Sequence, residues 1–147
     1  MILLDVNILL YAYDETSPHH GGIRSWLQKL LSGPEQVGIP WLTLWGFIRI
    51  STNSRINETP LEPGAAIGIL QSLLTWPGVT IIEPGPHHLH ILEELVIEGQ
   101  ASGSRVTDAA LGALAIEHGA TLASTDRDFS RFPNLRWINP VKTGTGS

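Results

Sequence analysis

Apolar residues occur along the chain either in short runs or at helical spacing, and the two patterns alternate. The short runs, bounded by polar or turn-forming residues, predict buried parallel strands. They are Ile2–Leu4, 37–39, Val79–Ile82, Thr121–Ala123 and, as a last short strand, Trp137–Ile138. Segments with helical periodicity predict helices at 7–13, 17–31, 41–50, 64–76, 86–97 and 106–118. Strands that alternate with helices predict an α/β fold with a central parallel sheet covered on both faces.

Turn-forming residues and apolar faces refine this pattern. Pro18 suits the first position of the second helix, and Gly119 is a natural C-cap for the helix at 106–118. The segment WLTLWGFIRI at 41–50 is apolar on nearly every face, which predicts a buried or interface helix. The 147 residues suit one domain, which we place at 1–141, followed by a loose C-terminal tail at 142–147.

Composition and the N-terminal segment indicate the cellular compartment that we expect for the protein. The chain has no cysteine, so disulfides and thiolate metal sites are excluded, which fits a reducing cytoplasm. The apolar stretches of the N-terminal segment MILLDVNILLYAYDE are short, Asp5 interrupts them, and no basic residue precedes them. They therefore predict neither a signal peptide nor a membrane span. We expect a cytoplasmic protein without a membrane partner.

The formal net charge is −5, whereas nucleic-acid binders are usually basic. A carboxylate cluster that holds a divalent metal would inflate the acidic count, and the bound metal would reverse the local field. Seven of the nine basic residues are Arg, the side chain best shaped for phosphate. The charge thus weakens an RNA-binding interpretation without excluding it.

Acidic residues follow two predicted strands and open one predicted helix. Asp5 comes directly after the first strand, and Asp126 follows the fourth. Asp108 lies in the first turn of the helix that leads into the fourth strand, and Asp128 shares the turn of Asp126. In parallel sheets, ligands bind beyond the carboxyl ends of the strands. We therefore expect these carboxylates to converge at one edge of the sheet.

Clustered carboxylates repel one another unless a positive charge lies among them. That charge can come from Arg or Lys, or from a divalent cation. Oxygen-only ligands favour Mg²⁺ or Mn²⁺ over zinc, and such ions can generate a hydroxide nucleophile, orient a phosphodiester and stabilise the leaving oxygen. Asp5, Asp108 and Asp126 are accordingly candidate catalytic residues and metal ligands, with Asp128 as a further candidate ligand.

Each acid also has a purely structural alternative. Asp5 or Asn7 can cap the following helix. Asp108 can occupy a first turn because the helix dipole favours an acid there. Asp126 and Asp128 can be turn residues whose side chains bind local backbone. The functional interpretation depends on the acids acting together.

Three segments contain these acids: MILLDVNIL around Asp5, VTDAALGALA around Asp108 and TLASTDRDF around Asp126. They resemble the signature segments of PIN-domain proteins, most closely the VapC toxins of bacterial type II toxin–antitoxin systems, and the likeness extends from the first residue to about residue 140. The resemblance implies a PIN-like three-layer α/β/α domain with Mg²⁺- or Mn²⁺-dependent endoribonuclease activity. It also implies inhibition by a VapB-like antitoxin protein.

By position, the resemblance makes Asp5, Asp108 and Asp126 metal ligands or site acids. Asn7 and Asp128 correspond to supporting polar groups, and Ser124 or Thr125 occupies the polar position before the last acid. One departure concerns the third helix, where many family members carry a Glu and this chain has Gly46. That loss puts a second metal ion in doubt.

RNA contacts and assembly follow from other features. Arg49 and Arg127 are candidate RNA-binding residues, with helix capping and surface charge as the alternatives. The surplus apolar surface of the helix at 41–50 predicts a homodimer with Trp45 or a neighbour near the interface or an antitoxin groove. The resemblance also implies dimers.

Two other functions compete with the nuclease. Aspartate-phosphorylating enzymes and receivers need a Lys after a later strand, and neither Lys29 in an early helix nor Lys142 in the tail fits. The other rival is a degenerate PIN domain that binds RNA or a protein without catalysis, which Gly46 keeps open. A zinc site at His87 and His90 is rejected because no acid or cysteine completes the ligand set.

Overall fold

The structure, a computed structural model, describes residues 1–141 and forms one five-stranded sheet in which all the strands are parallel. The strand order is β3-β2-β1-β4-β5, so the first strand lies at the centre. The strands are β1 (Ile2–Leu4), β2 (Val37–Pro40), β3 (Val79–Ile82), β4 (Thr121–Ala123) and β5 (Trp137–Ile138). The predicted loose tail at 142–147 lies outside the described residues.

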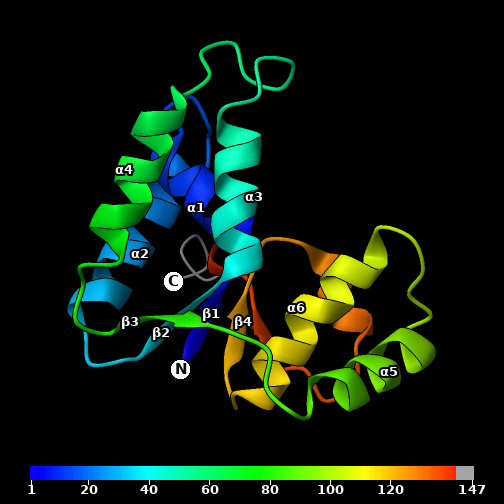
Figure 1. The fold of residues 1–147 in the computed structure, drawn as a ribbon. Helices are drawn as coiled ribbons and strands as arrows, with labels where there is room; N and C mark the ends of the chain where they lie inside the picture. The colour runs from blue at the N-terminus through cyan, green and yellow to red at the C-terminus, as the bar shows by residue number, and fades with distance from the viewer. Residues whose placement is uncertain (142–147) are drawn as a thin grey trace.

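Helices cover both faces of this sheet (Figure 1). One face is covered by the first four helices and the other by the last two, which confirms the predicted three-layer arrangement. The helices are α1 (Val6–Tyr13), α2 (His20–Ser32), α3 (Trp41–Ser51), α4 (Pro63–Leu73), α5 (His88–Glu98) and α6 (Arg105–Glu117), followed by the 3-10 helix η1 (Arg127–Arg131). Within residues 1–141, no helix is long and apolar enough to cross a membrane.

The two cores are built from alternate residues of the same strands. Leu4 contributes to the core beneath α1 to α4, whereas Leu3 contributes to the core beneath α5 and α6. A Cβ atom at Gly38 would lie 2.6 Å from Ile82 Cγ1 and 2.9 Å from Leu3 Cδ1. Glycine at this position of β2 therefore allows the second core to close against the sheet.

Two helices begin later than the sequence predicts, because a turn precedes each. Pro18 lies in a turn in which Ser17 Oγ accepts a hydrogen bond from the His19 backbone N–H, and α2 starts only at His20. Pro86 likewise precedes α5, which starts at His88. The predicted cap at Gly119 is confirmed by its left-handed φ of 64° after the end of α6.

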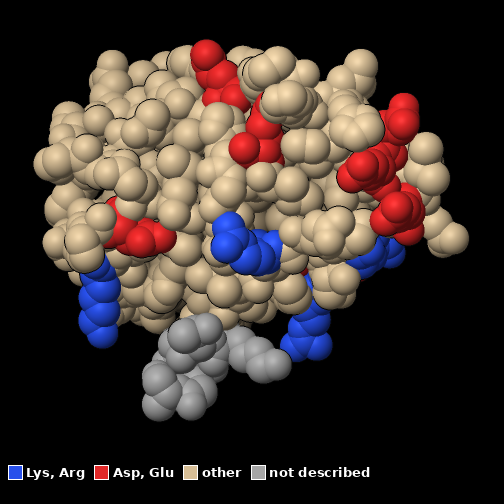
Figure 2. Space-filling model, turned by 90° about the horizontal axis from the view of Figure 1, so that it is seen from below, with Lys and Arg blue, Asp and Glu red and all other residues tan. Residues whose placement is uncertain are grey.

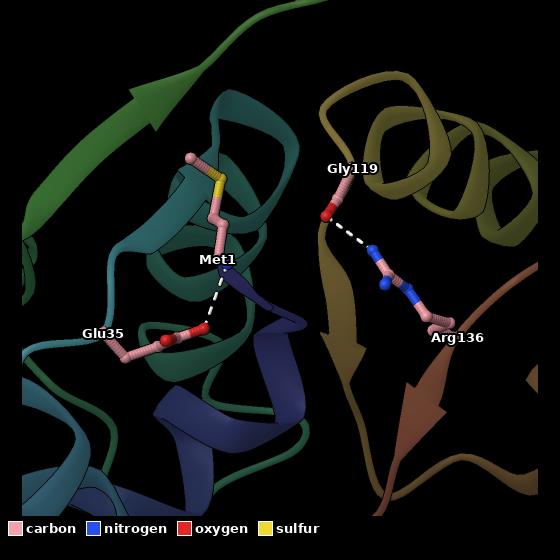
Figure 3. Close-up of polar contacts among 4 residues, drawn as sticks. All are labelled: Met1, Glu35, Gly119 and Arg136. Atoms are coloured by element: carbon pink, nitrogen blue, oxygen red, sulfur yellow. Dashed lines mark hydrogen bonds and ion pairs between the residues drawn. The ribbon is translucent and has the colours of Figure 1, made fainter.

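The amino side of the sheet is held by two polar contacts (Figure 3). The Met1 amino group forms an ion pair with Glu35 Oε1 at 3.0 Å. Arg136 Nη2 donates to the Gly119 carbonyl oxygen at 2.6 Å, which ties β5 to the end of α6. Both contacts lie at the strand ends away from Asp5, so they fix the sheet without occupying its carboxyl edge.

Helix α3 has a buried face and an open one. Thr43 Oγ1 donates to the Leu4 carbonyl oxygen at 2.8 Å, so the first turn of α3 is anchored to the end of β1. On the opposite side, the rings of Trp41 and Trp45 stack with centroids 6.1 Å apart, and Trp45 remains 62% exposed. The apolar character of this helix therefore exceeds what the chain itself buries.

Candidate active site at the carboxyl edge of the sheet

Asp5 is fixed at the junction of β1 and α1 by hydrogen bonds to both of its carboxylate oxygens. Oδ1 accepts from the Val6 backbone N–H at 2.7 Å, which makes Asp5 the N-cap of α1. Oδ2 accepts from Ser124 Oγ at 2.7 Å and from Asn7 Nδ2 at 3.2 Å. The capping role considered for Asp5 is therefore real, and it coexists with a position at the centre of the site.

Ser124 and Asn7 join the end of β1 to the end of β4. Ser124 is fully buried, and its Oγ also accepts from Asn7 Nδ2 and from the Asp126 backbone N–H, each at 3.1 Å. Asn7 Oδ1 accepts from the Thr125 backbone N–H at 3.2 Å. The hydroxyl that binds Asp5 is thus that of Ser124, and Thr125 contributes its backbone.

Asp126 and Asp128 open the 3-10 helix η1 beside this network. Asp126 is the N-cap of η1, and its Oδ1 accepts from the Asp128 backbone N–H at 2.9 Å. Asp128 is exposed, and its Oδ2 lies 3.2 Å from Arg105 Nη1. Local capping thus engages one oxygen of Asp126, and the ion pair with Arg105 engages one oxygen of Asp128.

Asp108 approaches the other acids from the first turn of α6. Its carboxylate accepts no hydrogen bond within residues 1–141. Partial burial raises its pKa above the ordinary value of 3.8, and the negative charges of Asp126, Asp5 and Asp128 raise it further, against a lowering by Arg105. Three other carboxylates are therefore close enough to act on Asp108.

The same repulsion acts on Asp5. Burial raises the pKa of Asp5 above 3.8, and the negative charge of Asp126 adds to the rise. Hydrogen bonds from Ser124, the Val6 backbone and Asn7 act in the opposite direction. Asp5 and Asp108, which come from different elements, thus both experience the charge of Asp126. The four aspartates Asp5, Asp108, Asp126 and Asp128 are called the acidic cluster below.

The donors of the acidic cluster suit a hard divalent cation. All of its acidic ligands are carboxylates, the adjacent polar groups are a hydroxyl and an amide, and excess negative charge is balanced nearby by one guanidinium. Such oxygen donors are those that Mg²⁺ and Mn²⁺ prefer. In their present conformations, however, no three Asp, Glu or His side chains of residues 1–141 are arranged to hold one ion together. The chemistry of the donors fits the metal, and closure of the ligand set requires the side chains to move.

Both predicted RNA-binding residues are exposed, and the glycine on α3 packs against the start of α1. Arg49 is exposed in the last turn of α3, and Arg127 is exposed at the start of η1. A Cβ atom at Gly46 would lie 3.3 Å from Val6 Cγ2, next to Asp5 in the chain. The position therefore faces the start of α1, and glycine lets α3 approach it closely.

The opposite side of the molecule has a different charge distribution. Viewed from below Figure 1, Lys and Arg side chains stand singly, and Asp and Glu side chains gather at the edge on the side of α5 (Figure 2). Helix α5 carries the exposed acids Glu93, Glu94 and Glu98. The described residues therefore form no concentrated basic patch on the face in that view.

Sequence reasoning left Ser124 as one of two choices and did not single out Arg105. The choice between Ser124 and Thr125 depends on which side chain points toward Asp5, and strand alternation from the buried Leu122 was the available signal. Arg105 was visible as a residue three positions before Asp108, a spacing that places two side chains on one helix face. Its contact with Asp128 required the tertiary structure.

Comparison with known protein families and sequences gives consistent matches. The sequence profile of the PIN domain matches residues 2–135. Ribonuclease VapC25 of Mycobacterium tuberculosis is 39% identical over 140 residues, which cover 95% of this chain and 99% of that protein. Ribonuclease VapC33 of the same species is 35% identical over 142 residues, with 97% and 99% coverage.

Solved structures show the same fold at lower sequence identity. The structure of VapBC2 from Rickettsia felis bound to a promoter DNA fragment matches with a TM-score of 0.69 and 22% identity, over 95% of this chain and 98% of that one. Mycobacterium tuberculosis VapC20, described as a sarcin-ricin loop cleaving toxin, matches with a TM-score of 0.61 and 20% identity, over 92% and 99%.

Proposed function

The chain belongs to the PIN-domain family and, within it, to the VapC ribonucleases, and from this premise we propose that it is a divalent-metal-dependent endoribonuclease. In this proposal it hydrolyses RNA phosphodiester bonds and is the toxin of a VapBC-type pair. The ribonuclease names of its relatives support RNA as the substrate. We further propose that residues 1–141 fold as one domain, most of which the PIN profile covers.

One observation carries the proposal: carboxylates from three separate elements act on one another at the carboxyl edge of the sheet. Asp5 follows β1, Asp108 opens α6, and Asp126 follows β4. The negative charges of Asp5 and Asp126 both raise the pKa of Asp108. Repulsion between these carboxylates destabilises the folded protein, and a bound divalent cation would offset that loss of stability.

Asp5, Asp108 and Asp126 are the residues that would hold Mg²⁺ or Mn²⁺, with Asp128 as a further ligand. A cation there would make water a stronger nucleophile, orient the phosphodiester and stabilise the leaving oxygen. Ser124 and Asn7 orient Asp5 through hydrogen bonds of 2.7 and 3.2 Å to Oδ2. Arg49 and Arg127 would bind the RNA backbone, because Arg pairs well with phosphate oxygens.

A VapB-like antitoxin and a second copy of the chain are the proposed protein partners, in the cytoplasm. The neighbouring solved structures include toxin–antitoxin complexes, which supports an antitoxin. The stacked pair Trp41 and Trp45, 41% and 62% exposed, supports a protein interface on α3.

Trp45→Glu should weaken self-association or antitoxin binding in light-scattering measurements. A parent protein that stays monomeric at high micromolar concentration would remove the homodimer from the proposal.

RNA cleavage by the purified protein tests the function directly. Cleavage should require Mg²⁺ or Mn²⁺, stop in EDTA and return when the metal is restored. Asp5→Asn should reduce cleavage by more than about a hundredfold, since even indirect partners of metal ligands can matter by 10- to 100-fold. The variant should remain folded, because Asn retains an acceptor for the Val6 N–H. Full activity of Asp5→Asn at saturating Mg²⁺ would reject the mechanism.

Binding without catalysis is the second candidate function. Two features favour it: the family resemblance implies a Glu at the position of Gly46, and within residues 1–141 no three acidic or histidine side chains are arranged to hold an ion. The same assay separates the two functions. RNA binding without any metal-dependent cleavage would support the binding domain, whereas cleavage that EDTA abolishes would exclude it.

A further inference from the structure

Arg105, the first residue of α6, is a cation that acts on the acidic cluster. Its Nη1 lies 3.2 Å from Asp128 Oδ2, and its charge lowers the pKa of Asp108. Nη1 is buried, but within the described part of the chain it makes no hydrogen bond of good geometry. Electrostatic attraction to the neighbouring carboxylates therefore holds the guanidinium in place, and Nη1 has no fixed hydrogen-bonding partner in this part of the chain.

The position of Arg105 has no explanation in the helix itself. The first turn of a helix carries a partial positive charge and disfavours a cation. Within residues 1–141, the side chain of Arg105 donates no hydrogen bond to the backbone, in contrast to Arg136, whose Nη2 binds the Gly119 carbonyl oxygen. The nearby carboxylates of Asp108 and Asp128 are what stabilise a guanidinium at this place.

A divalent cation and Arg105 would compete for the same negative charge. Asp128 Oδ2 is engaged by the guanidinium, so a metal ion that drew Asp128 into its ligand set would break this ion pair. A metal ion would also neutralise much of the field that attracts Arg105. The side chain of Arg105 is 41% exposed, so it can leave Asp128 without disturbing the core.

We propose that Arg105 is an exchangeable counter-ion of the acidic cluster: it pairs with Asp128 in the metal-free protein and binds an RNA phosphate once a divalent cation has displaced it. The inference rests on the proposed ribonuclease function and deepens it. It makes Arg105 a substrate-binding residue whose availability depends on metal binding. A guanidinium released beside the site is well suited to a phosphate, because its planar donors match phosphate oxygens in pairs.

The test compares Arg105→Ala with Arg131→Ala, which removes the same charge from the last turn of η1. Calorimetric titration with Mn²⁺ measures metal affinity without RNA. Arg105→Ala should bind Mn²⁺ about two- to fivefold more tightly than Arg131→Ala, the size of effect expected for removing a partly exposed ion pair. Circular dichroism melting shows that each variant is folded, and Arg105→Gln replaces Arg105→Ala if the latter is not.

The second measurement is the affinity for a short single-stranded RNA with Ca²⁺ in place of Mg²⁺, with the RNA shown to be intact afterwards. Here Arg105→Ala should bind less tightly than Arg131→Ala, and the slope of log affinity against log salt should fall by about 0.7, as for one lost phosphate contact. Without metal, the substitution should change RNA affinity far less. Tighter metal binding together with weaker RNA binding is the signature of the exchange.

The possible outcomes distinguish failure of the Arg105 exchange from failure of the proposed metal-dependent function. If the parent protein binds neither Mn²⁺ nor Mg²⁺, the metal-dependent function and the inference both fail. If the parent binds metal but Arg105→Ala matches Arg131→Ala in either measurement, the exchange is wrong and the proposed function stands. An Arg105→Ala variant that binds metal more weakly than Arg131→Ala would also overturn the inference.

Discussion

Helix α6 carries an acid near each end, and the two acids experience opposite environments. Asp108 is in the first turn, where the helix dipole favours a negative charge, yet its pKa is raised. Glu117 is the last residue, where the dipole disfavours a negative charge, yet its pKa is lowered. The helix dipole therefore fails to predict the direction of the pKa shift at either end of α6.

Immediate neighbours explain the difference. Glu117 accepts hydrogen bonds from the Gly85 and His87 backbone N–H groups, at 2.8 and 2.9 Å, and these donors stabilise its charged form. Asp108 is partly buried, has three other carboxylates close by and is opposed by the single charge of Arg105. Glu117 is thus a structural acid that holds the loop before α5, whereas the negative charge of Asp108 is only partly offset by Arg105.

The largest expected difference between these two acids is in RNA cleavage. Asp108→Asn should lower cleavage by more than about a hundredfold, because it removes a charged oxygen from the proposed metal site. Glu117→Gln should cleave at close to the parental rate, since Glu117 accepts its hydrogen bonds from the loop before α5 and not from the acidic cluster. Rates measured at saturating Mg²⁺ compare the two variants. Equal losses of activity in both would show that α6 needs its acids for folding rather than for chemistry.

Metal-induced stabilisation should also distinguish the two ends of α6. Metal that binds only the folded protein raises its stability by about 2.7 kcal/mol at a concentration 100 times Kd, or roughly 10 °C in Tm for a chain of this size. Glu117→Gln should melt lower than the parent but keep this shift. Asp108→Asn should melt no lower than the parent without metal, because repulsion is relieved, and should lose most of the shift. An unchanged shift in Asp108→Asn would place the ion elsewhere.

The smallest expected effect is the pH dependence of stability in EDTA, where the two acids should have opposite signs. Because the pKa of Asp108 is raised in the folded state, its contribution to the free energy of unfolding is full below pH 3.8 and is lost as pH rises through the folded-state pKa. Because the pKa of Glu117 is lowered in the folded state, its contribution to the free energy of unfolding is present above pH 4.5 and is lost as pH falls through the folded-state pKa.

Relative to the parent, Asp108→Asn should therefore gain Tm as pH rises from about 4 toward neutrality. Glu117→Gln should instead show its deficit near neutral pH and lose it in acid. Thermal melts of the three proteins across this range provide the measurement. Parallel Tm profiles for the two variants would contradict the contrast between the ends of α6.

The sequence predicted the features that depend on local pattern. Asp5 after an apolar run and Asp126 after another fixed the edge of the sheet where the acids lie, because parallel strands end together. Features that depend on tertiary packing were not predictable. The loop contacts of Glu117 depend on how α5 and α6 pack, and the contact of Arg105 with Asp128 depends on how η1 lies against α6. The start of α2 at His20 reflects a turn at Ser17 that competes with the helical pattern.

The most direct test of the central claim is a crystal structure of the protein with Mn²⁺, located by its anomalous scattering. The account predicts an anomalous peak within the acidic cluster, with directly bound oxygens of Asp5, Asp108 or Asp126 about 2.0–2.2 Å from the ion. It also predicts that these three carboxylates turn toward that one position. A well-occupied ion bound elsewhere, or any of the three aspartates pointing to another face of the sheet, would contradict the claim that these residues form the metal site.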